Sequence, residues 1–322
     1  MLFDTMSIRM TISSGPVRDW ATAVDLIRHS WKPGREATRE YTPEFVATLL
    51  GYPGAGPVLA PAYYDDGALI AFVAGFPRSV RLEGQVRRLL LMSFFTVAPA
   101  YRGQGLGRAI WVECLQQAKD NGYDGAIHYC VDGNASNAIT VGAAKSAGLE
   151  ARRVFTAGFL MRSLRPGSDE QPEPEAIDAG LFRSAAECLN PGVTLTRLWS
   201  EAEAQWHLRN TGRLSIADQT GGVLTGVVQR AADAAHTPCF FLEDVLWDRL
   251  TPEARGTLLQ RLLRRASRVA SIAVAPALGY ADVSPFLAAG FRRSPRLLHA
   301  YLTLWRAPPD SSEFSGLYLD IV

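Results

Sequence analysis

The chain has 322 residues, which is enough for two ordinary domains that each bury a core. Its 33 lysines and arginines nearly balance 32 aspartates and glutamates, and the net charge of +1 argues against a nucleic-acid-binding surface. No run approaches the roughly 18 apolar residues of a membrane span, and the N-terminus lacks the pattern of a secretion signal.

The first half of the chain predicts two helices, a three-stranded meander, and then alternating helices and strands. After a short strand over 7–12, a helix is expected to begin at Ser14-Gly-Pro16, because apolar residues recur there at helical spacing. Thr42 and Pro43 begin the second helix, which ends at Gly51. The remaining predicted elements are strands over 58–64, 68–74 and 89–97, a helix over 105–121, a strand over 126–131, a helix over 136–147 and a strand over 154–164.

Residues 165–178 are rich in proline and acidic residues and predict an exposed linker. Beyond it the same order of elements recurs more weakly, and Ser200 with Glu203 predicts a capping box. The predicted elements are strands over 193–198, 214–217, 223–231 and 239–246, a helix over 252–268, a strand over 271–275, a helix over 283–289 and a strand over 297–305. We interpret this repeat as two copies of one domain, although two unrelated domains stay an alternative.

The most informative stretch is the turn between the 89–97 strand and the helix that follows it. Its glycines, Gly103, Gly105 and Gly107, let backbone N–H groups approach a ligand closely. The unpaired amides of the helix start add a positive dipole end, so this turn is suited to hold an anion. The alternative is a glycine-rich turn without a ligand.

The pattern Arg-x-x-Gly-x-Gly at Arg102, Gly105 and Gly107, preceded by Val-x-Pro-x-Tyr, resembles the pyrophosphate loop of the GNAT acyl-CoA transferase superfamily. The resemblance implies an α/β fold with a mixed sheet, here as two GNAT-like acyltransferase domains in tandem. Residues 1–164 would be the CoA-binding domain, 179–308 a degenerate second copy, and 309–322 an apolar tail that packs on a domain or a neighbouring subunit.

The resemblance also implies how CoA is held. The pyrophosphate would bind the loop that contains Arg102, Gly103, Gln104, Gly105, Leu106, Gly107 and Arg108. The pantetheine arm would pair with the strand edge at Phe95, Thr96 and Val97, where a backbone amide could stabilise the oxyanion formed at the thioester. Asn137 would face that arm, or it is an ordinary polar residue at a helix start.

The residues that would transfer protons are not given by the family pattern. The tyrosine that often protonates the departing thiolate falls at Ala144, so we consider His128 and Asp132, near the end of the 126–131 strand. His128 is otherwise a hydrogen-bonded core histidine, and Asp132 is otherwise part of a plain Asp-Gly turn. Cys130 as a nucleophile is a weaker alternative to a small buried cysteine.

The second copy carries one glycine, Gly256, where the first has three, and it places Asp248 and Glu253 where phosphates would bind. Carboxylates there would repel a pyrophosphate, so we expect this copy to cover the acceptor cleft of the first domain or to stabilise it. Four scattered cysteines and five histidines without paired spacing predict neither a disulfide framework nor a metal site.

The sequence therefore predicts a cytoplasmic N-acetyltransferase that moves the acetyl group of acetyl-CoA, or another acyl group from its CoA thioester, directly to an amine. A small-molecule acceptor is favoured over a protein, because a second domain would enclose the cleft. No nucleic-acid or membrane partner and no metal are expected, and the chain would be a monomer or a homodimer. The alternatives are a non-catalytic acyl-CoA-binding or sensing module and another CoA-thioester reaction on the same fold.

Overall fold

The computed structural model describes residues 12–31, 39–53, 56–165, 177–189, 192–209, 212–233, 235–306 and 313–321. The first half contains β1 (Ile12–Pro16), α1 (Trp20–Ser30), α2 (Pro43–Leu50), β2 (Pro61–Asp65), β3 (Ala68–Leu82), β4 (Gln85–Val97), η1 (Pro99–Tyr101), α3 (Leu106–Asp120), β5 (Gly125–Val131), α4 (Ser136–Ser146) and β6 (Ala151–Ser163). The second half contains α5 (Ala179–Glu187), β7 (Leu195–Arg197), α6 (Glu201–Arg209), β8 (Arg213–Ala217), β9 (Val223–Arg230), β10 (Pro238–Leu246), α7 (Pro252–Ala266), β11 (Ile272–Ala277), α8 (Ser284–Ala288), β12 (Arg292–Leu304) and β13 (Leu317–Tyr318). Among the helices of these residues, none is long and apolar enough to cross a membrane.

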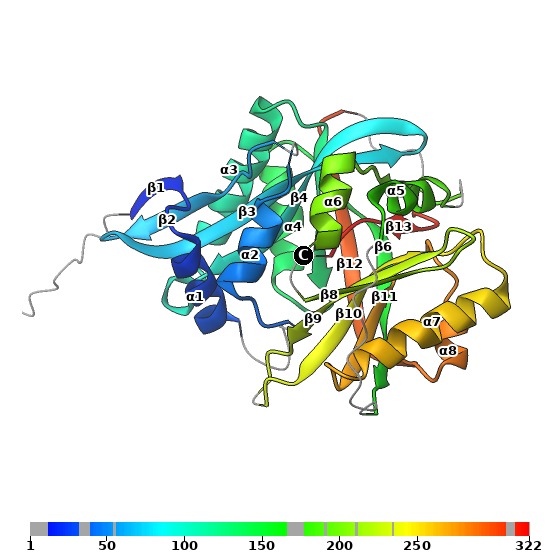
Figure 1. The fold of residues 1–322 in the computed structure, drawn as a ribbon. Helices are drawn as coiled ribbons and strands as arrows, with labels where there is room; N and C mark the ends of the chain where they lie inside the picture. The colour runs from blue at the N-terminus through cyan, green and yellow to red at the C-terminus, as the bar shows by residue number, and fades with distance from the viewer. Residues whose placement is uncertain are drawn as a thin grey trace, which may run out of the picture.

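The strands of the described residues form one mixed sheet, and its main path runs β1-β2-β3-β4-β5-β12-β6-β11-β10-β9-β8 (Figure 1). The predicted α/β fold with a mixed sheet is therefore confirmed. Within each half the order is the same, β2-β3-β4-β5 and β8-β9-β10-β11, and the last pair of each series is parallel while the others are antiparallel.

The two halves exchange their last strands. Strand β12 from the second half pairs antiparallel with β5 of the first half, and β6 from the first half pairs antiparallel with β11 of the second. The two exchanged strands also pair with each other, which joins the halves into a continuous sheet. The division of the chain at 165–178 stays a prediction, and residues 166–176 lie outside the described residues.

Two local predictions are wrong at the level of single elements. Residues Ile12–Pro16 form strand β1 rather than the start of a helix, because their backbone pairs with β2. Helix α1 begins only at Trp20, where the Asp19 carboxylate accepts the N–H groups of Ala21 and Thr22. Helix α5 was not predicted, and the predicted strand over 7–12 lies, except for Ile12, outside the described residues.

Helices cover both faces of the first-half sheet. On one face, Trp20 of α1 packs edge-on against Phe72 of β3. The Trp31 indole donates to the hydroxyl of Thr96, and Thr96 pairs with Phe72 and lies on the same face of the sheet. On the other face, Trp111 of α3 packs edge-on against Phe95 of β4. In the second half, α7 lies against β8 and β9. Strand β4 therefore runs through the middle of the first-half core.

The apolar tail predicted over 309–322 packs onto the chain itself, within its described part 313–321. Phe314, Leu317, Tyr318 and Leu319 are all buried, and β13 pairs with β7. Residues 309–312 and Val322 lie outside the described residues. The burial of the tail is consistent with its apolar sequence, because exposing these side chains to water would be costly.

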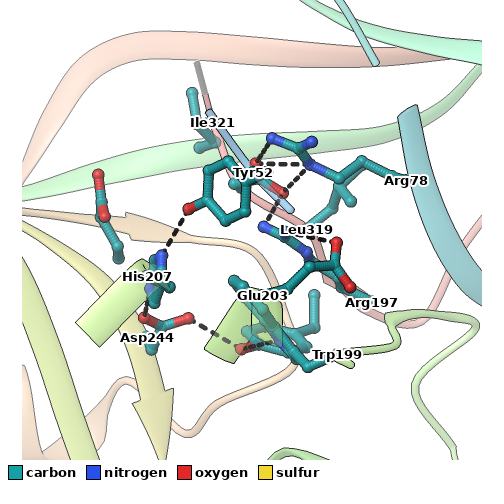
Figure 2. A network of polar contacts seen from close by, with 12 residues as sticks. Tyr52, Arg78, Arg197, Trp199, Glu203, His207, Asp244, Leu319 and Ile321 are labelled. Carbon is teal, nitrogen blue, oxygen red and sulfur yellow. Dashed lines mark hydrogen bonds and ion pairs between the residues drawn. The ribbon is translucent and has the colours of Figure 1, made fainter. Parts of the chain in front are cut away.

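Buried ion pairs hold the tail between the two halves (Figure 2). The Asp320 carboxylate accepts a bond of 2.6 Å from Arg78 Nη2 of β3 and lies 2.8 Å from Arg197 Nη1 of β7. Both guanidinium side chains are only 1% exposed. Although burial alone would raise it, the positive charges of Arg197 and Arg78 hold the pKa of Asp320 well below its usual range.

A second set of buried polar contacts lies beside the first (Figure 2). The Tyr52 hydroxyl is 2.7 Å from His207 Nδ1, and His207 Nε2 is 2.7 Å from Asp244 Oδ2 of β10. The other Asp244 oxygen accepts from the Tyr318 hydroxyl of the tail at 2.8 Å. Residues from α2's C-terminal end, α6, β10 and β13 are thus joined in one network, so the tail is part of the contact between halves.

Candidate active site

Strand β4 contains a bulge in its pairing with β3, just beyond the position where its pairing with β5 ends. Ala74 of β3 pairs with Ser93 and Phe72 pairs with Thr96, so two residues of β4, Phe94 and Phe95, lie opposite one residue of β3. Phe94 has a φ of +56°, which turns the local backbone. Strong local twist of this kind often re-aims backbone and side-chain groups next to a site.

The parallel pairing of β4 with β5 ends just before this bulge. The last paired residues are Met92 and His128, although β4 continues to Val97 and β5 to Val131. Within the described chain, no strand pairs with this edge of β4 beyond Met92. The two strands therefore open a wedge, and its β4 edge carries backbone groups that an amide-containing ligand could pair with.

The glycine turn lies at the end of this wedge and leads into α3. Gly105 occupies the N-cap of α3 with a φ of +82°, and no side chain caps this helix start. The amides of the first turn of α3 are therefore not satisfied by a cap, as an anion-binding helix start requires. Gly107 is needed for packing, because a Cβ there would lie 2.8 Å from Phe95 Cζ.

Arg102 holds the turn in place. Its Nε donates to the Val97 carbonyl at 3.1 Å, and its Nη2 donates to the Ser30 carbonyl at 2.6 Å. The guanidinium thus links the end of β4, the end of α1 and the glycine turn. These bonds explain an arginine at this position without a ligand, and they fix the backbone that would bind one.

One large cavity of about 680 Å³ joins the glycine turn and the wedge to the second half of the chain. On the first-half side it reaches Gly103, Gly105 and His128, and on the other side it reaches Phe241 of β10 and Val274 of β11. Nine of the predicted CoA-binding residues line it: Phe95, Thr96, Val97, Arg102, Gly103, Gly105, Leu106, Gly107 and Arg108. The structure thus brings the residues predicted from the strand and from the turn to one site, and their binding of CoA stays a prediction.

Two predicted residues are not among those that line this cavity. Gln104 donates its side-chain amide to the Ala100 carbonyl. Asn137 donates to the carbonyls of Val131 and Asn134 at 2.9 and 2.8 Å, and so fixes the connection between β5 and α4. These contacts match the interpretation of Asn137 as a polar residue at a helix start, whereas a contact with pantetheine stays a prediction.

His128 lines the cavity but is enclosed. Its Nε2 is 2.8 Å from the Thr140 hydroxyl, and its ring stacks on Tyr301 and meets Trp111 edge-on. Burial lowers the pKa of His128 to about 3, so the imidazole is neutral and a weak base at neutral pH. These contacts are those of the alternative interpretation, a hydrogen-bonded core histidine.

Asp132 lies at the exposed end of β5. Its Oδ1 is 3.1 Å from His299 Nε2 of β12, and His299 Nδ1 is 3.0 Å from the Thr156 hydroxyl of β6. This row of contacts crosses the exchanged strands and places Asp132 outside the cavity lining. Cys130 does line the cavity, but burial raises the pKa of its thiol to about 11, as expected for an unreactive cysteine.

Several cavity residues were missed by the sequence analysis. Arg39 and Tyr41 precede α2, Arg296 lies in β12, and Ile321 lies in the tail. Only the exchange of strands and the path of the tail bring these distant segments together, so no local motif indicated them. Among the described residues that line the cavity, none is an aspartate or a glutamate.

The second half contains a wedge built in the same way. The parallel pairing of β10 with β11 ends at Phe241 and Val274, and β10 has a bulge at Glu243. Here, however, the Tyr280 hydroxyl accepts from the Val245 N–H at 3.2 Å and donates to the Glu243 carbonyl at 3.4 Å. The chain's own side chain therefore occupies backbone groups of β10, whereas in the first wedge Tyr129 does not take the corresponding place and no described strand pairs with β4 beyond Met92.

Comparison with known proteins agrees with this geometry. The model of the acetyltransferase (GNAT) family matches residues 20–148. These residues belong to the GNAT acetyltransferase family. The match covers the wedge and the glycine turn, and it ends at Gly148, before β6. No curated protein matches the chain significantly.

Solved structures extend the similarity to both halves. Saccharomyces cerevisiae N-myristoyltransferase with bound myristoyl-CoA has a TM-score of 0.69 and 14% identity, over 92% of this chain and 84% of that chain. A GCN5-related N-acetyltransferase from Kribbella flavida has a TM-score of 0.59 and 14% identity, over 93% and 72% of the two chains. A probable N-acyltransferase from Enterococcus faecalis V583 has a TM-score of 0.55 and 13% identity, over 92% and 72%. At these identities the likeness shows the fold, which is that of the GNAT and N-myristoyltransferase acyltransferases.

Among the described residues, no group of three or more histidine, cysteine, aspartate or glutamate side chains could hold a metal ion. The four cysteines are free, and three of them are buried. The acyltransferase family and the fold together indicate an enzyme that transfers an acyl group from acyl-CoA to an acceptor.

Proposed function

We propose that the chain is an acyl-CoA-dependent N-acyltransferase, with acetyl-CoA as the donor and a small-molecule amine as the acceptor. The observation that carries the proposal is the cavity that joins the uncapped start of α3, the bulged edge of β4 and the face of the second half. The donor would enter along the wedge, and the acceptor would approach from the second half.

The glycine turn would bind the pyrophosphate, and the edge of β4 at Phe95, Thr96 and Val97 would pair with the pantetheine arm. The amine nitrogen would then attack the thioester carbonyl, so that a C–N bond forms and the C–S bond breaks. CoA leaves as the thiol, and the proton lost by the amine balances the step. A backbone amide of the β4 bulge would stabilise the developing oxyanion.

Much of the rate would come from positioning, because a thioester is already reactive. His128 and Asp132 stay predictions as proton-transfer residues, and their contacts support structural roles more than catalytic ones. The fold of the N-myristoyltransferase that was solved with myristoyl-CoA supports an acyl-CoA donor, but it leaves the length of the acyl chain to be measured.

The test is release of free thiol from CoA esters of two, four, eight and fourteen carbons, each with and without a panel of amines. Acceptor-dependent release with the acetyl ester as the best donor supports the proposal. Release without an acceptor would instead indicate thioester hydrolysis. Tight binding of CoA esters by calorimetry without release from any of them would indicate a sensing module, and the proposed catalysis would be wrong.

A further inference from the structure

Beyond the first wedge, the cavity extends over a largely apolar part of the sheet. This part consists of five neighbouring strands in the order β5-β12-β6-β11-β10. Each of them contributes an apolar side chain to the cavity lining: Val131, Leu298, Phe159, Val274 and Phe241. Five adjacent strands span about 19 Å, since neighbouring strands lie about 4.8 Å apart. The cavity therefore reaches from the proposed donor wedge across the exchanged strands to the second wedge.

The lining side chains from β6, β11 and β10 lie on one face of the sheet. Phe241 is paired with Val274, and paired residues of neighbouring strands point to the same side. Phe159 is paired with Pro276, which also lines the cavity and lies two residues beyond Val274 in β11. Because alternate residues of a strand share a face, these four residues form one apolar surface. We call these four residues the apolar floor.

Part of the apolar floor is separate from the main hydrophobic core. Phe241 and Val274 form a small cluster with Val227 and Cys239, and Phe159 packs against it. Phe241 is paired with Val274 on one side and with Val227 on the other. The two valines are 5% and 4% exposed, but only Val274 of these two lines the cavity. The cluster thus presents one side to the cavity and packs its other side within the second half.

Two arginines border this space, and both have partners within the chain. The Arg39 guanidinium lies over the ring of Phe241 at 4.4 Å. Its Nη1 is 3.4 Å from Glu243 Oε1 and donates to the Ile321 carbonyl at 3.4 Å. Arg296 also interacts with other groups of the protein. Arg39 therefore acts as part of the wall, and the space that the apolar floor offers suits an apolar group.

The apolar floor begins next to the expected reaction centre. The Tyr41 ring is 5.0 Å from the ring of Phe94, the residue at the β4 bulge. Tyr41 lies two residues from Arg39, which covers Phe241, so a short series of contacts leads from the bulge to the apolar floor. An acetyl group has only two carbons and would fill a small part of this space. Most of it would then be left for the acceptor.

We propose that the acceptor is a primary amine on an apolar alkyl or aromatic group, and that Phe241 and Val274 bind this group. This inference rests on the proposed function and adds the substrate class. The reaction is the one given above: the C–N bond forms, the C–S bond breaks, and the amine loses its proton, which gives an N-acetylated apolar amine. An apolar chain could also belong to the acyl group of the donor, because the same side chains would hold it. The experiment therefore includes both sources.

The first measurement is thiol release from acetyl-CoA with ethylamine, butylamine, hexylamine and octylamine. We expect kcat/KM to rise about fourfold for each added methylene until the apolar floor is covered. Hexylamine is also compared with 5-aminopentanol, in which a hydroxyl replaces the terminal methyl group. Hexylamine should be favoured at least about 10-fold, because the hydroxyl would lose its bonds to water. Equal values for this pair would overturn the apolar acceptor and leave the acyltransferase intact.

The second measurement tests the donor as the source of the apolar chain. Ethylamine is the acceptor, and acetyl-CoA, hexanoyl-CoA and octanoyl-CoA are compared as donors by thiol release. We expect acetyl-CoA to be the best of the three. If kcat/KM instead rises with the length of the acyl chain, and not with that of the amine, the apolar floor holds the acyl group and the apolar acceptor is wrong.

The third measurement uses two variants with the same substitution on opposite sides of Phe241. Val274→Thr places a hydroxyl in the apolar floor with little change in shape, and should lower the preference for hexylamine over 5-aminopentanol by about fivefold. Val227→Thr is the matched control, because Val227 belongs to the same small cluster but does not line the cavity. Its preference should equal that of the unmodified protein. Equal falls in both variants would mean that packing of the cluster, rather than contact with the amine, sets the preference, and the role of Val274 would be wrong.

The two proposals fail in different ways. Absence of thiol release from every donor with every amine would overturn the proposed function. In that case, calorimetry of hexylamine and 5-aminopentanol with the CoA-saturated protein still tests the apolar site. Tighter binding of hexylamine that is weakened by Val274→Thr and not by Val227→Thr supports the site, and equal affinities of the two amines would overturn it.

Discussion

The wedge between β4 and β5 and the wedge between β10 and β11 share one arrangement of strands, but they differ in what occupies them. In each, a parallel strand pair separates after a few residues, the longer strand is bulged, and a helix starts beyond it. In the first wedge, the helix start is a glycine without a cap and the strand edge faces the cavity. In the second, side chains of the chain occupy the corresponding groups.

Four sets of contacts close the second wedge. The Thr251 hydroxyl accepts the Ala254 N–H at the start of α7, and Arg255 donates to the carbonyls of Trp247 and Asp248. The Tyr280 hydroxyl contacts both Val245 and Glu243 of β10. Just beyond β11, the Leu278 carbonyl accepts from the N–H of Leu317 in the tail. Together they occupy backbone groups of β10, of the start of α7 and of the chain just beyond β11.

A ligand site on such a pair of strands is therefore defined by which backbone groups remain unsatisfied. Unsatisfied backbone groups in the first wedge would cost stability, whereas the corresponding groups in the second wedge form internal hydrogen bonds. The second half would then act as a wall of the cavity and an anchor for the tail, since Phe241 and Val274 line the cavity.

Asp320 makes the buried ion pairs that anchor the tail between the two halves. The change Asp320→Asn leaves Arg78 buried without its carboxylate and Arg197 with only its 3.6 Å contact to Glu203, and we expect it to lower the free energy of unfolding by about 3–5 kcal/mol. Urea denaturation measures this loss, with Asp66→Asn in the exposed turn between β2 and β3 as the control. A loss below about 1 kcal/mol would show that the ion pairs do not hold the tail in place.

The same residue gives the expected pH dependence. Because the pKa of Asp320 is lower in the folded than in the unfolded state, its stabilising effect is fully present above the unfolded value of about 4. The effect declines as the pH falls below that value toward the folded pKa. Asp320→Asn should therefore flatten the acid side of the stability profile measured for the unmodified protein.

The open state of the first wedge depends most on Gly105. In Gly105→Asp the new carboxylate would lie at the amides that are expected to bind pyrophosphate, and we expect CoA affinity to fall by about 100-fold or more. No heavy atom lies within 4 Å of the added Cβ, but the positive φ of Gly105 strains any side chain there, so the control has to carry the same strain.

Gly122→Asp is the matched control for this change. Gly122 also has a positive φ, +73°, and open space around its Cβ, but it lies beyond the other end of α3. Calorimetry should find normal CoA affinity in this variant. Equal weakening in both variants would mean that strain in the helix, rather than charge at its start, explains the loss.

Local sequence patterns predicted most elements and the position of the glycine turn before α3, whereas its binding of CoA stays a prediction. The Thr42 cap, the hairpin at 65–67 and the Ser200–Glu203 capping box are all present, because each depends on residues a few positions apart. Strand β1 was misread because its pairing with β2 is not a local property. The glycines of the turn were informative because positive φ and close approach are constraints on the backbone itself.

Contacts between distant segments could not be predicted in this way. Nothing in the sequence of β12 distinguishes pairing with β5 from pairing with β11, since the alternation of apolar residues suits either. The cluster of Arg39, Tyr41 and Arg296 follows from that exchange, and so does the contact of Asp132 with His299. The candidate cofactor loop was therefore predictable, and the acceptor side of the cavity was not.

A smaller effect is expected for the side chain that fills the second wedge. The change Tyr280→Phe leaves the Val245 N–H without its partner and should lower the free energy of unfolding by about 1–2 kcal/mol. Calorimetric titration should still find one CoA per chain, as in the unmodified protein. Binding of a second CoA to either protein would show that the second wedge is open. The contacts of Tyr280 would then not explain the difference between the two wedges.

The smallest effect is expected at the cap of α7. Thr251→Ala removes the acceptor for the Ala254 N–H and should cost about 1 kcal/mol of stability, whereas Thr251→Ser keeps the hydroxyl and should cost little. Neither variant should bind CoA at this helix start, because the Val245 N–H remains paired with Tyr280 and Arg255 still covers the preceding loop. Equal losses from serine and alanine would mean that the methyl group of Thr251, rather than its hydroxyl, stabilises this turn. The cap would then not account for the difference between the starts of α3 and α7. That difference would have to come from the glycines before α3.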